Sequence, residues 1–191
     1  MNGVGTKSLV SFVQAANGKT PAGKQDPLRR GANVRLTLIG VGSLALGALV
    51  YMLDRPAATV YLLPHALSFA GPHRWFGVLG GHLPEFIHVY GFILLTVALG
   101  LSPRRVVPIC AFWWVVDSLF EIGQHPAIAP HLAAWLPNWF QHLPILDHTA
   151  DYFLHGTFDP GDLVAIVLGT LVAYVTIRLI HSKEKDHVHP A

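Results

Sequence analysis

Four stretches of the chain are apolar over nearly their whole length, and more polar segments separate them. These stretches cover residues 36–53, 86–101, 106–123 and 162–180. At 1.5 Å of helical rise per residue, each is long enough, or nearly so, to cross about 30 Å of hydrocarbon. We therefore predict an all-α integral membrane protein with four transmembrane helices. The second stretch is the shortest, so we expect its helix to begin before Phe86.

Lys and Arg are distributed unevenly among the segments that flank these stretches. Six of them precede the first stretch, Arg104 and Arg105 occupy the turn between the second and third, and three lie near or after the end of the fourth. The loop after the first stretch holds only Arg55 and Arg74, and residues 124–161 hold none. Because cytoplasmic segments carry the excess of Lys and Arg, we predict that the N-terminus and the C-terminus are both cytoplasmic.

We predict one membrane domain between two polar tails. Residues 1–33 are expected to form a disordered cytoplasmic tail, residues 34–181 the four-helix transmembrane domain, and residues 182–191 a cytoplasmic C-terminal tail. Both outer loops are apolar, contain aromatic residues and are interrupted by prolines. Aromatic rings favour the headgroup level, so we predict short interfacial helices in the two outer loops. A re-entrant segment within residues 57–84 stays open as an alternative.

Composition supports the bilayer as the main partner. Of the 191 residues, 52% are hydrophobic and only 13% are charged, whereas a soluble domain usually has about 25% charged residues. The net charge of +2 comes from basic residues at the chain ends and in one turn, so we predict no nucleic-acid partner. Cys110 is the single cysteine, which excludes an internal disulfide and a cysteine-based metal site.

Acidic and histidine side chains inside the apolar stretches are costly unless they are paired or hydrated. Asp117, Glu121 and His125 follow one another at steps of four, which places them on one helical face. Counted from Val106, Asp117 lies about 16 Å and Glu121 about 22 Å along the helix. No Lys or Arg occurs between Val106 and Ile177. Histidines, a bound cation or protonation must therefore neutralise the two acids.

Two further segments bring polar groups to the same side. Glu85, His88 and His82 lie at the outer end of the second stretch, and an Asp-Pro-Gly-Asp sequence opens the fourth. That sequence is also typical of a helix start with Asp159 as N-cap, and His88 alone would also fit a buried core histidine. We predict an outward-facing pocket lined by His88, Asp117, Glu121, Gln124, His125 and Asp162.

Carboxylates together with neutral imidazoles are the ligands that zinc, manganese and iron prefer. If a metal is bound, the predicted cofactor is a divalent transition metal with Asp117, Glu121, His125 and His88 as ligands. Such a metal would activate water, with Glu121 as the candidate catalytic residue, acting as ligand or general base. The sequence contains neither HExxH nor GxSxG. Whether the protein is an enzyme is left open.

The order of these residues resembles the VanZ-like family of small bacterial membrane proteins. The similarity covers about half of the chain, from Glu85 to Tyr174. The family's Asn position holds Ile166 here, and the loop before the last helix is longer than usual. The resemblance implies a protein of the bacterial inner (cytoplasmic) membrane and the cell envelope, in a family associated with glycopeptide resistance but without an established mechanism. The matching residues are His88 in EFIHVYGF, Glu121 and Gln124 in FEIGQ, and Asp162 with Gly169 in GDLVAIVLG.

Three functions agree with these observations. The leading hypothesis is a VanZ-like inner-membrane protein whose acid and histidine pocket engages an envelope lipid head group or a cation. The first alternative is a metal-dependent membrane hydrolase that acts on a lipid phosphate or ester. The second is an accessory or structural subunit of a membrane complex, which would use the small-residue face of Gly40, Gly42 and Gly47 to contact a partner membrane subunit.

Overall fold

The computed structural model describes residues 27–55, 68–71, 73–100, 103–143 and 146–188. Within these ranges all regular secondary structure is helical. The four long helices are α2 (Pro27–Asp54), α3 (Leu79–Ala98), α4 (Val106–Gly123) and α7 (Pro160–Val188). Each contains a segment of 18 to 25 residues that is long and apolar enough to cross a membrane. The predicted all-α fold with four transmembrane helices is confirmed.

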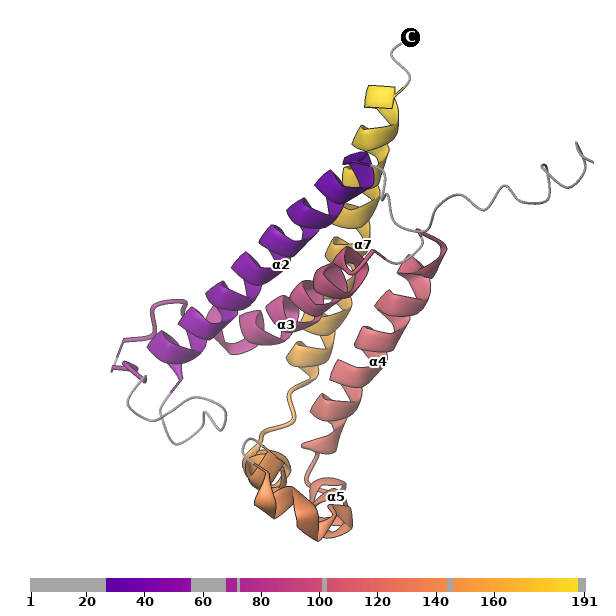
Figure 1. Cartoon of the computed structure of the whole chain (residues 1–191). Helices are drawn as coiled ribbons and strands as arrows, with labels where there is room; N and C mark the ends of the chain where they lie inside the picture. Colours follow the sequence, from indigo (N-terminus) through magenta and orange to yellow (C-terminus); the bar gives the residue numbers. More distant parts are fainter. Residues whose placement is uncertain (1–26, 56–67, 72, 101–102, 144–145, 189–191) are drawn as a thin grey trace, which may run out of the picture.

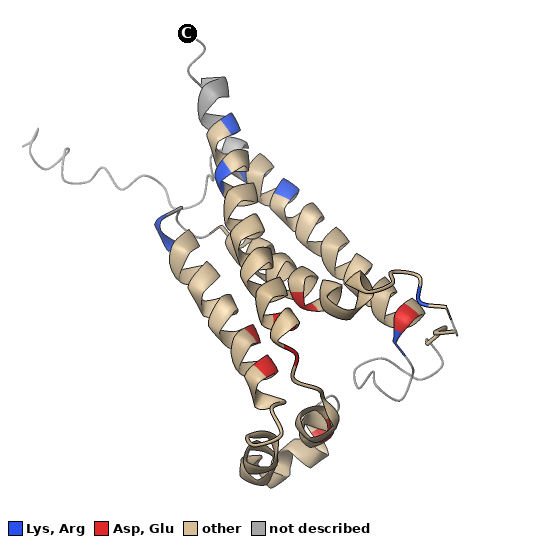
Figure 2. Cartoon of the chain, turned by 180° about the vertical axis from the view of Figure 1, so that it is seen from behind, with Lys and Arg blue, Asp and Glu red and all other residues tan. Residues whose placement is uncertain are grey.

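Helix α3 lies in the middle of the four (Figure 1). Helix α2 packs mainly against α3, whereas α7 packs against both α3 and α4. The start of α2, the α3–α4 turn and the end of α7 lie at one end of the molecule, and the other connections lie at the opposite end (Figure 1). Figure 2 shows that Asp and Glu gather in the half of the bundle away from the C-terminus. We call that end the acidic end.

The helices extend beyond the apolar stretches. Helix α2 starts at Pro27, so residues 27–33 are helical and not part of a disordered tail. Residues 1–26 lie outside the described part. Helix α3 starts at Leu79, before Phe86 as expected, and ends at Ala98. Helix α7 continues to Val188, into the predicted C-terminal tail. Hydropathy indicates where a helix leaves the lipid, but it does not indicate where the helix ends. A helix continues into the polar segment as long as its residues are compatible with helical backbone hydrogen bonding.

The connection from α4 to α7 contains two short helices, α5 (Ala129–Trp135) and α6 (Thr149–His155), with 3-10 turns at Asn138–His142 and Leu146–His148. Short helices in this loop are therefore confirmed. Trp135 is 86% exposed at the end of α5, as expected for an aromatic side chain at headgroup level. The α2–α3 loop, predicted to be the other outer loop, has turns at residues 75–78, and residues 79–84 belong to α3. Most of the segment predicted to be interfacial or re-entrant falls on residues 56–67, outside the described part.

The small-residue face of α2 packs inside the molecule. A Cβ added at Gly40 would lie 3.0 Å from Leu95, and one added at Gly47 would lie 3.0 Å from Ile87, both on α3. A Cβ at Gly42 would meet nothing within 4 Å. Two of the three glycines thus serve the α2–α3 contact, which is how small residues bring membrane helices close together. The argument for an accessory subunit, which needed this face for a partner, is weakened accordingly.

Candidate functional site

The start of α7 forms a helix cap with an acidic side chain on each side of it. Asp159 Oδ1 accepts the backbone N–H of Gly161 at 2.8 Å, and Pro160 is the first residue of the helix. Asp159 is therefore the N-cap that the sequence suggested. Asp162 follows in the first turn and is 7% exposed.

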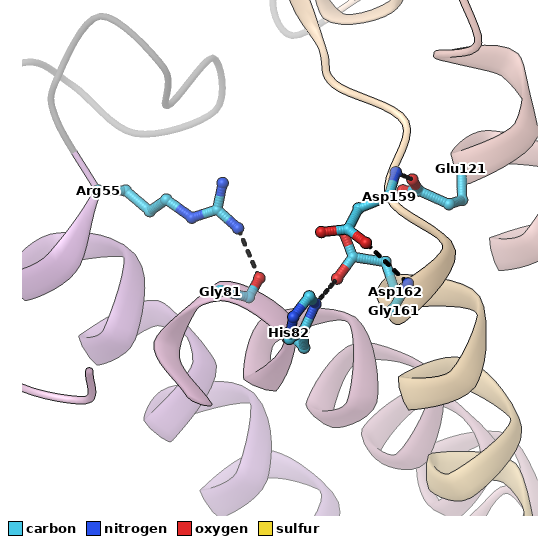
Figure 3. A network of polar contacts seen from close by, with 7 residues as sticks. All are labelled: Arg55, Gly81, His82, Glu121, Asp159, Gly161 and Asp162. Carbon is cyan, nitrogen blue, oxygen red and sulfur yellow. Dashed lines mark hydrogen bonds and ion pairs between the residues drawn. The ribbon is translucent and has the colours of Figure 1, made fainter. Parts of the chain in front are cut away.

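His82 of α3 meets this cap. Its Nδ1 lies 2.6 Å from Asp162 Oδ1, a contact that joins the first turn of α3 to the first turn of α7 (Figure 3). Gly161 makes room for it, because a Cβ there would lie 2.6 Å from His82 Cε1 and 3.1 Å from Asp159 Oδ1. The imidazole and the two carboxylates therefore converge over a residue that has no side chain.

Glu121 attaches the end of α4 to the same point. Its Oε1 accepts the backbone N–H of Asp159 at 2.7 Å (Figure 3). Glu121 is 4% exposed, and it is the residue that both the helical stripe and the VanZ-like resemblance singled out. It fixes the backbone of Asp159 and leaves the Asp159 carboxylate directed at the cap.

Glu85 and Arg55 complete the surroundings. Glu85 lies one turn after His82 on α3, and its Oε2 is buried with no hydrogen-bond partner among the described residues. It interacts electrostatically with Asp162 and with Arg55. The Arg55 guanidinium donates to the backbone oxygen of Gly81 at 2.8 Å (Figure 3).

We call the whole group the acid–His cluster. It joins the ends of four helices in one place. Its members are Arg55, His82, Glu85, Glu121, Asp159 and Asp162.

The six residues of the predicted pocket lie in three separate places. Glu121 and Asp162 belong to the acid–His cluster. His88 of α3 and Asp117 of α4 form a separate pair, about one turn from the cluster toward the opposite end of the bundle. His88 Nδ1 lies 3.4 Å from Asp117 Oδ1. The predicted metal ligands Asp117, Glu121, His125 and His88 are thus not brought together in this arrangement.

Gln124 and His125 form the third place, at the end of α4. Gln124 Nε2 donates to Tyr152 Oη of α6 at 2.8 Å. Burial raises the pKa of Tyr152, so its hydroxyl stays protonated. His125 is exposed, and its Nδ1 accepts the backbone N–H of Ala127 at 3.2 Å. These two residues organise the loop and do not contribute to the cluster through any of these bonds.

The predicted pocket omitted four residues of the cluster, namely Arg55, His82, Glu85 and Asp159. Residues 82 and 85 are three apart and share a helical face only if the helix already exists at residue 82. The apolar stretch began at Phe86, whereas α3 begins at Leu79. The earlier helix start expected from the sequence was the signal for His82, which was placed at the outer end of this helix but not included in the pocket. Asp159 was interpreted as an N-cap and not as a pocket residue. It is an N-cap, and it also belongs to the cluster.

The His88–Asp117 pair has a testable energetic consequence. Asp117 is 7% exposed, and its Oδ2 has no hydrogen-bond partner among the described residues. We expect His88→Leu to lower the free energy of unfolding by about 1–3 kcal/mol, because it leaves a buried carboxylate unpaired. In the double variant His88→Leu/Asp117→Leu most of this loss should be recovered. Unfolding in mixed detergent–SDS micelles measures these two variants and the single variant Asp117→Leu. If the effects of the two single variants add up to that of the double variant within about 0.5 kcal/mol, the pair does not contribute to stability.

No family model, curated protein or solved structure matches the chain. The VanZ-like resemblance therefore rests on the sequence residues that carry it.

Proposed function

We propose that this multi-pass membrane protein lies in a bacterial inner membrane and binds a positively charged ligand at its outer face, through the acid–His cluster. The ligand is a cation or the amine of an envelope lipid head group. One observation carries the proposal, namely the excess of carboxylates over cationic groups at the acidic end of the helices.

The charges of the cluster do not balance within the described residues. Glu85, Glu121, Asp159 and Asp162 contribute carboxylates, whereas Arg55 contributes the single fixed positive charge and His82 one that depends on protonation. Ion pairs of the cluster acids with Lys or Arg are absent from the described part, where the pairs involve histidine. Buried carboxylates are costly without a partner of opposite charge. A positively charged ligand supplies that partner.

The charge pattern supports an outward-facing cluster. The α3–α4 turn contains Arg104 and Arg105, and the last part of α7 contains Arg178. Both segments lie at the end opposite the acidic end (Figure 1), which is the end that cytoplasmic basic residues would occupy. The acidic end then faces the outer leaflet. Trp135 and Trp139 lie in its loop and are 86% and 55% exposed, which suits side chains that anchor a loop among lipid head groups.

The VanZ-like resemblance supports the envelope setting. Glu121 and Asp162, two of the residues that carry the resemblance, both belong to the cluster. His88 and Gln124, which carry it too, lie outside the cluster and hold other contacts. Membership of that family is part of this proposal. The hydrolase alternative requires a metal at the cluster, and two of the three glycines that the accessory-subunit alternative needed for a partner contact α3 instead.

A lipid competition tests the proposal. Native mass spectrometry of the full-length protein, with equal amounts of phosphatidylethanolamine and phosphatidylglycerol of the same acyl chains, compares a head group that has an amine with one that lacks it. We expect about tenfold more phosphatidylethanolamine adduct, since one charge-assisted hydrogen bond contributes about 1.5–3 kcal/mol. Asp162→Asn should reduce this preference, because it removes a buried carboxylate of the cluster.

Asp151→Asn is the matched control, because Asp151 is an exposed acid of α6 at the same end of the molecule. It should keep the preference of the wild type. The same spectra report the mass of any bound cation. If they show neither an amine preference nor a bound cation that depends on Asp162, the proposed function is wrong.

A further inference from the structure

We propose that His82, Asp159 and Asp162 are the ligands of one divalent transition-metal ion. This inference rests on the proposed function, because it names the cation of the same cluster. Each of the three residues offers one ligand atom, and these atoms all lie within 4.8 Å of one another. Among the residues that the structure describes, this is the group whose atoms meet in that way.

The spacing of the ligand atoms is close to what coordination requires. Metal–ligand bonds of about 2.0–2.2 Å place neighbouring ligand atoms of a tetrahedral ion about 3.3–3.6 Å apart. Atoms that lie within 4.8 Å of one another therefore reach these positions after side-chain shifts of about 1 Å. The 2.6 Å contact between His82 Nδ1 and Asp162 Oδ1 is a hydrogen bond that an ion would replace, with release of the shared proton.

The donor set indicates the class of metal. One imidazole nitrogen and two carboxylate oxygens suit zinc, manganese or ferrous iron, whereas calcium and magnesium prefer oxygen ligands alone. Three protein ligands also leave coordination positions open, as in metal sites that accept water or an external oxygen ligand. A lipid head-group oxygen is a ligand of that kind.

The protein holds the three side chains in place before any ion arrives. Gly161 leaves the space that a Cβ would fill between His82 and Asp159. Two hydrogen bonds fix Asp159: its carboxylate accepts the Gly161 N–H, and its own backbone N–H donates to Glu121 Oε1. Glu121 is thus a positioning residue, which acts on the ion through Asp159.

A second observation points to a missing positive charge at this place. Glu85 lies one turn from His82, and its Oε2 is enclosed by protein with no hydrogen-bond partner among the described residues. Its electrostatic interactions are with Asp162 and Glu121, which repel it, and with Arg55, which attracts it. Arg55 gives a guanidinium N–H to the Gly81 carbonyl. A divalent ion between His82 and the two aspartates would offset the repulsion among these carboxylates that the single charge of Arg55 does not offset.

Metal content of the full-length protein tests this inference. All samples carry His187→Ala and His189→Ala, so that metal binding by histidines near the C-terminus does not contribute to the measured content. The protein in detergent is dialysed against Zn²⁺ or Mn²⁺ alone and analysed by inductively coupled plasma mass spectrometry. We expect about one ion per chain, with His82→Gln and Asp162→Asn each weakening binding by at least about tenfold. Asp151→Asn and His131→Gln, both at exposed positions of the same loop, should bind like the parent.

Three outcomes overturn the inference: less than about one tenth of an ion in the parent protein, unchanged affinity in His82→Gln, or equal loss in the two control variants. The parent protein alone decides the first of these, even if a cluster variant does not fold, and thermal unfolding of the metal-free variants checks their folding. A preference for phosphatidylethanolamine that depends on Asp162 in a protein without metal would contradict the metal site and leave the proposed function standing.

Discussion

Asp54→Ala is expected to lower the free energy of unfolding by about 2–4 kcal/mol, because it removes two charge-assisted hydrogen bonds at once. Asp54 is the last residue of α2 and is 8% exposed. Its Oδ1 accepts the backbone N–H of Trp75 at 2.7 Å, and its Oδ2 accepts that of Phe76 at 2.9 Å. These bonds hold the end of the α2–α3 loop against α2 just before α3 begins, so their loss frees both this part of the loop and the first turn of α3.

Unfolding in mixed micelles of a mild detergent and SDS, followed by circular dichroism, measures the effect. Asp54→Asn retains one acceptor oxygen and should lose about half as much. Asp151→Ala is the matched control, since the exposed Asp151 faces His155 at 3.7 Å on the surface of α6 and such pairs contribute about 0–1 kcal/mol. If Asp54→Ala costs no more than Asp151→Ala, the carboxylate does not anchor the loop.

Gly169→Ala is expected to lower the free energy of unfolding by about 1–3 kcal/mol. A Cβ at this position of α7 would lie 2.5 Å from the backbone oxygen of Phe86 and 2.6 Å from Val89 Cγ1, both on α3. The backbone of α3 cannot move aside as a flexible side chain can, so the two helices must separate. That separation outweighs the gain of about 1 kcal/mol that alanine brings to a helix interior.

Gly42→Ala distinguishes packing from helix propensity. A Cβ at Gly42 of α2 meets nothing within 4 Å, so this variant should be as stable as the parent or slightly more stable. Both proteins are compared by the same unfolding experiment. If Gly169→Ala and Gly42→Ala changed the free energy of unfolding equally, the close approach of α3 and α7 at Gly169 would be contradicted.

The fold could be predicted from the sequence because hydrophobic length determines which segments cross a bilayer. Residues 106–123, predicted from hydropathy alone, coincide with α4 (Val106–Gly123). The start of α3 could not be fixed in the same way. Residues 79–85 contain two glycines, a proline, a histidine and a glutamate, which lower the hydropathy although the backbone there is helical. Pairing with α2 and α7 supports that first turn, and a pattern along one chain does not report such pairing.

The candidate site was predicted in part for a related reason. Helical periodicity places Asp117, Glu121 and His125 on one face, but it does not tell which neighbouring helix each one meets. In the structure Asp117 faces His88 of α3, whereas Glu121 faces the start of α7. Residues one turn apart on one helix therefore belong to different groups. Which of these groups a residue belongs to depends on the distances between helices. Those distances depend on packing at residues such as Gly161 and Gly169.

The hydrogen bond between Glu121 and the Asp159 N–H also bears on how this protein tolerates change. Glu121 lies in the last turn of α4, and the chain returns to it at Asp159. The segment between these two residues is therefore a loop whose two ends are held together. For a flexible loop with fixed ends, doubling its length costs only about 0.6 kcal/mol. Insertions near residues 142–146 would therefore enlarge this loop while its two ends stay fastened. Natural variation in length, or an inserted tag, can accumulate there without displacing the side chains of the acid–His cluster.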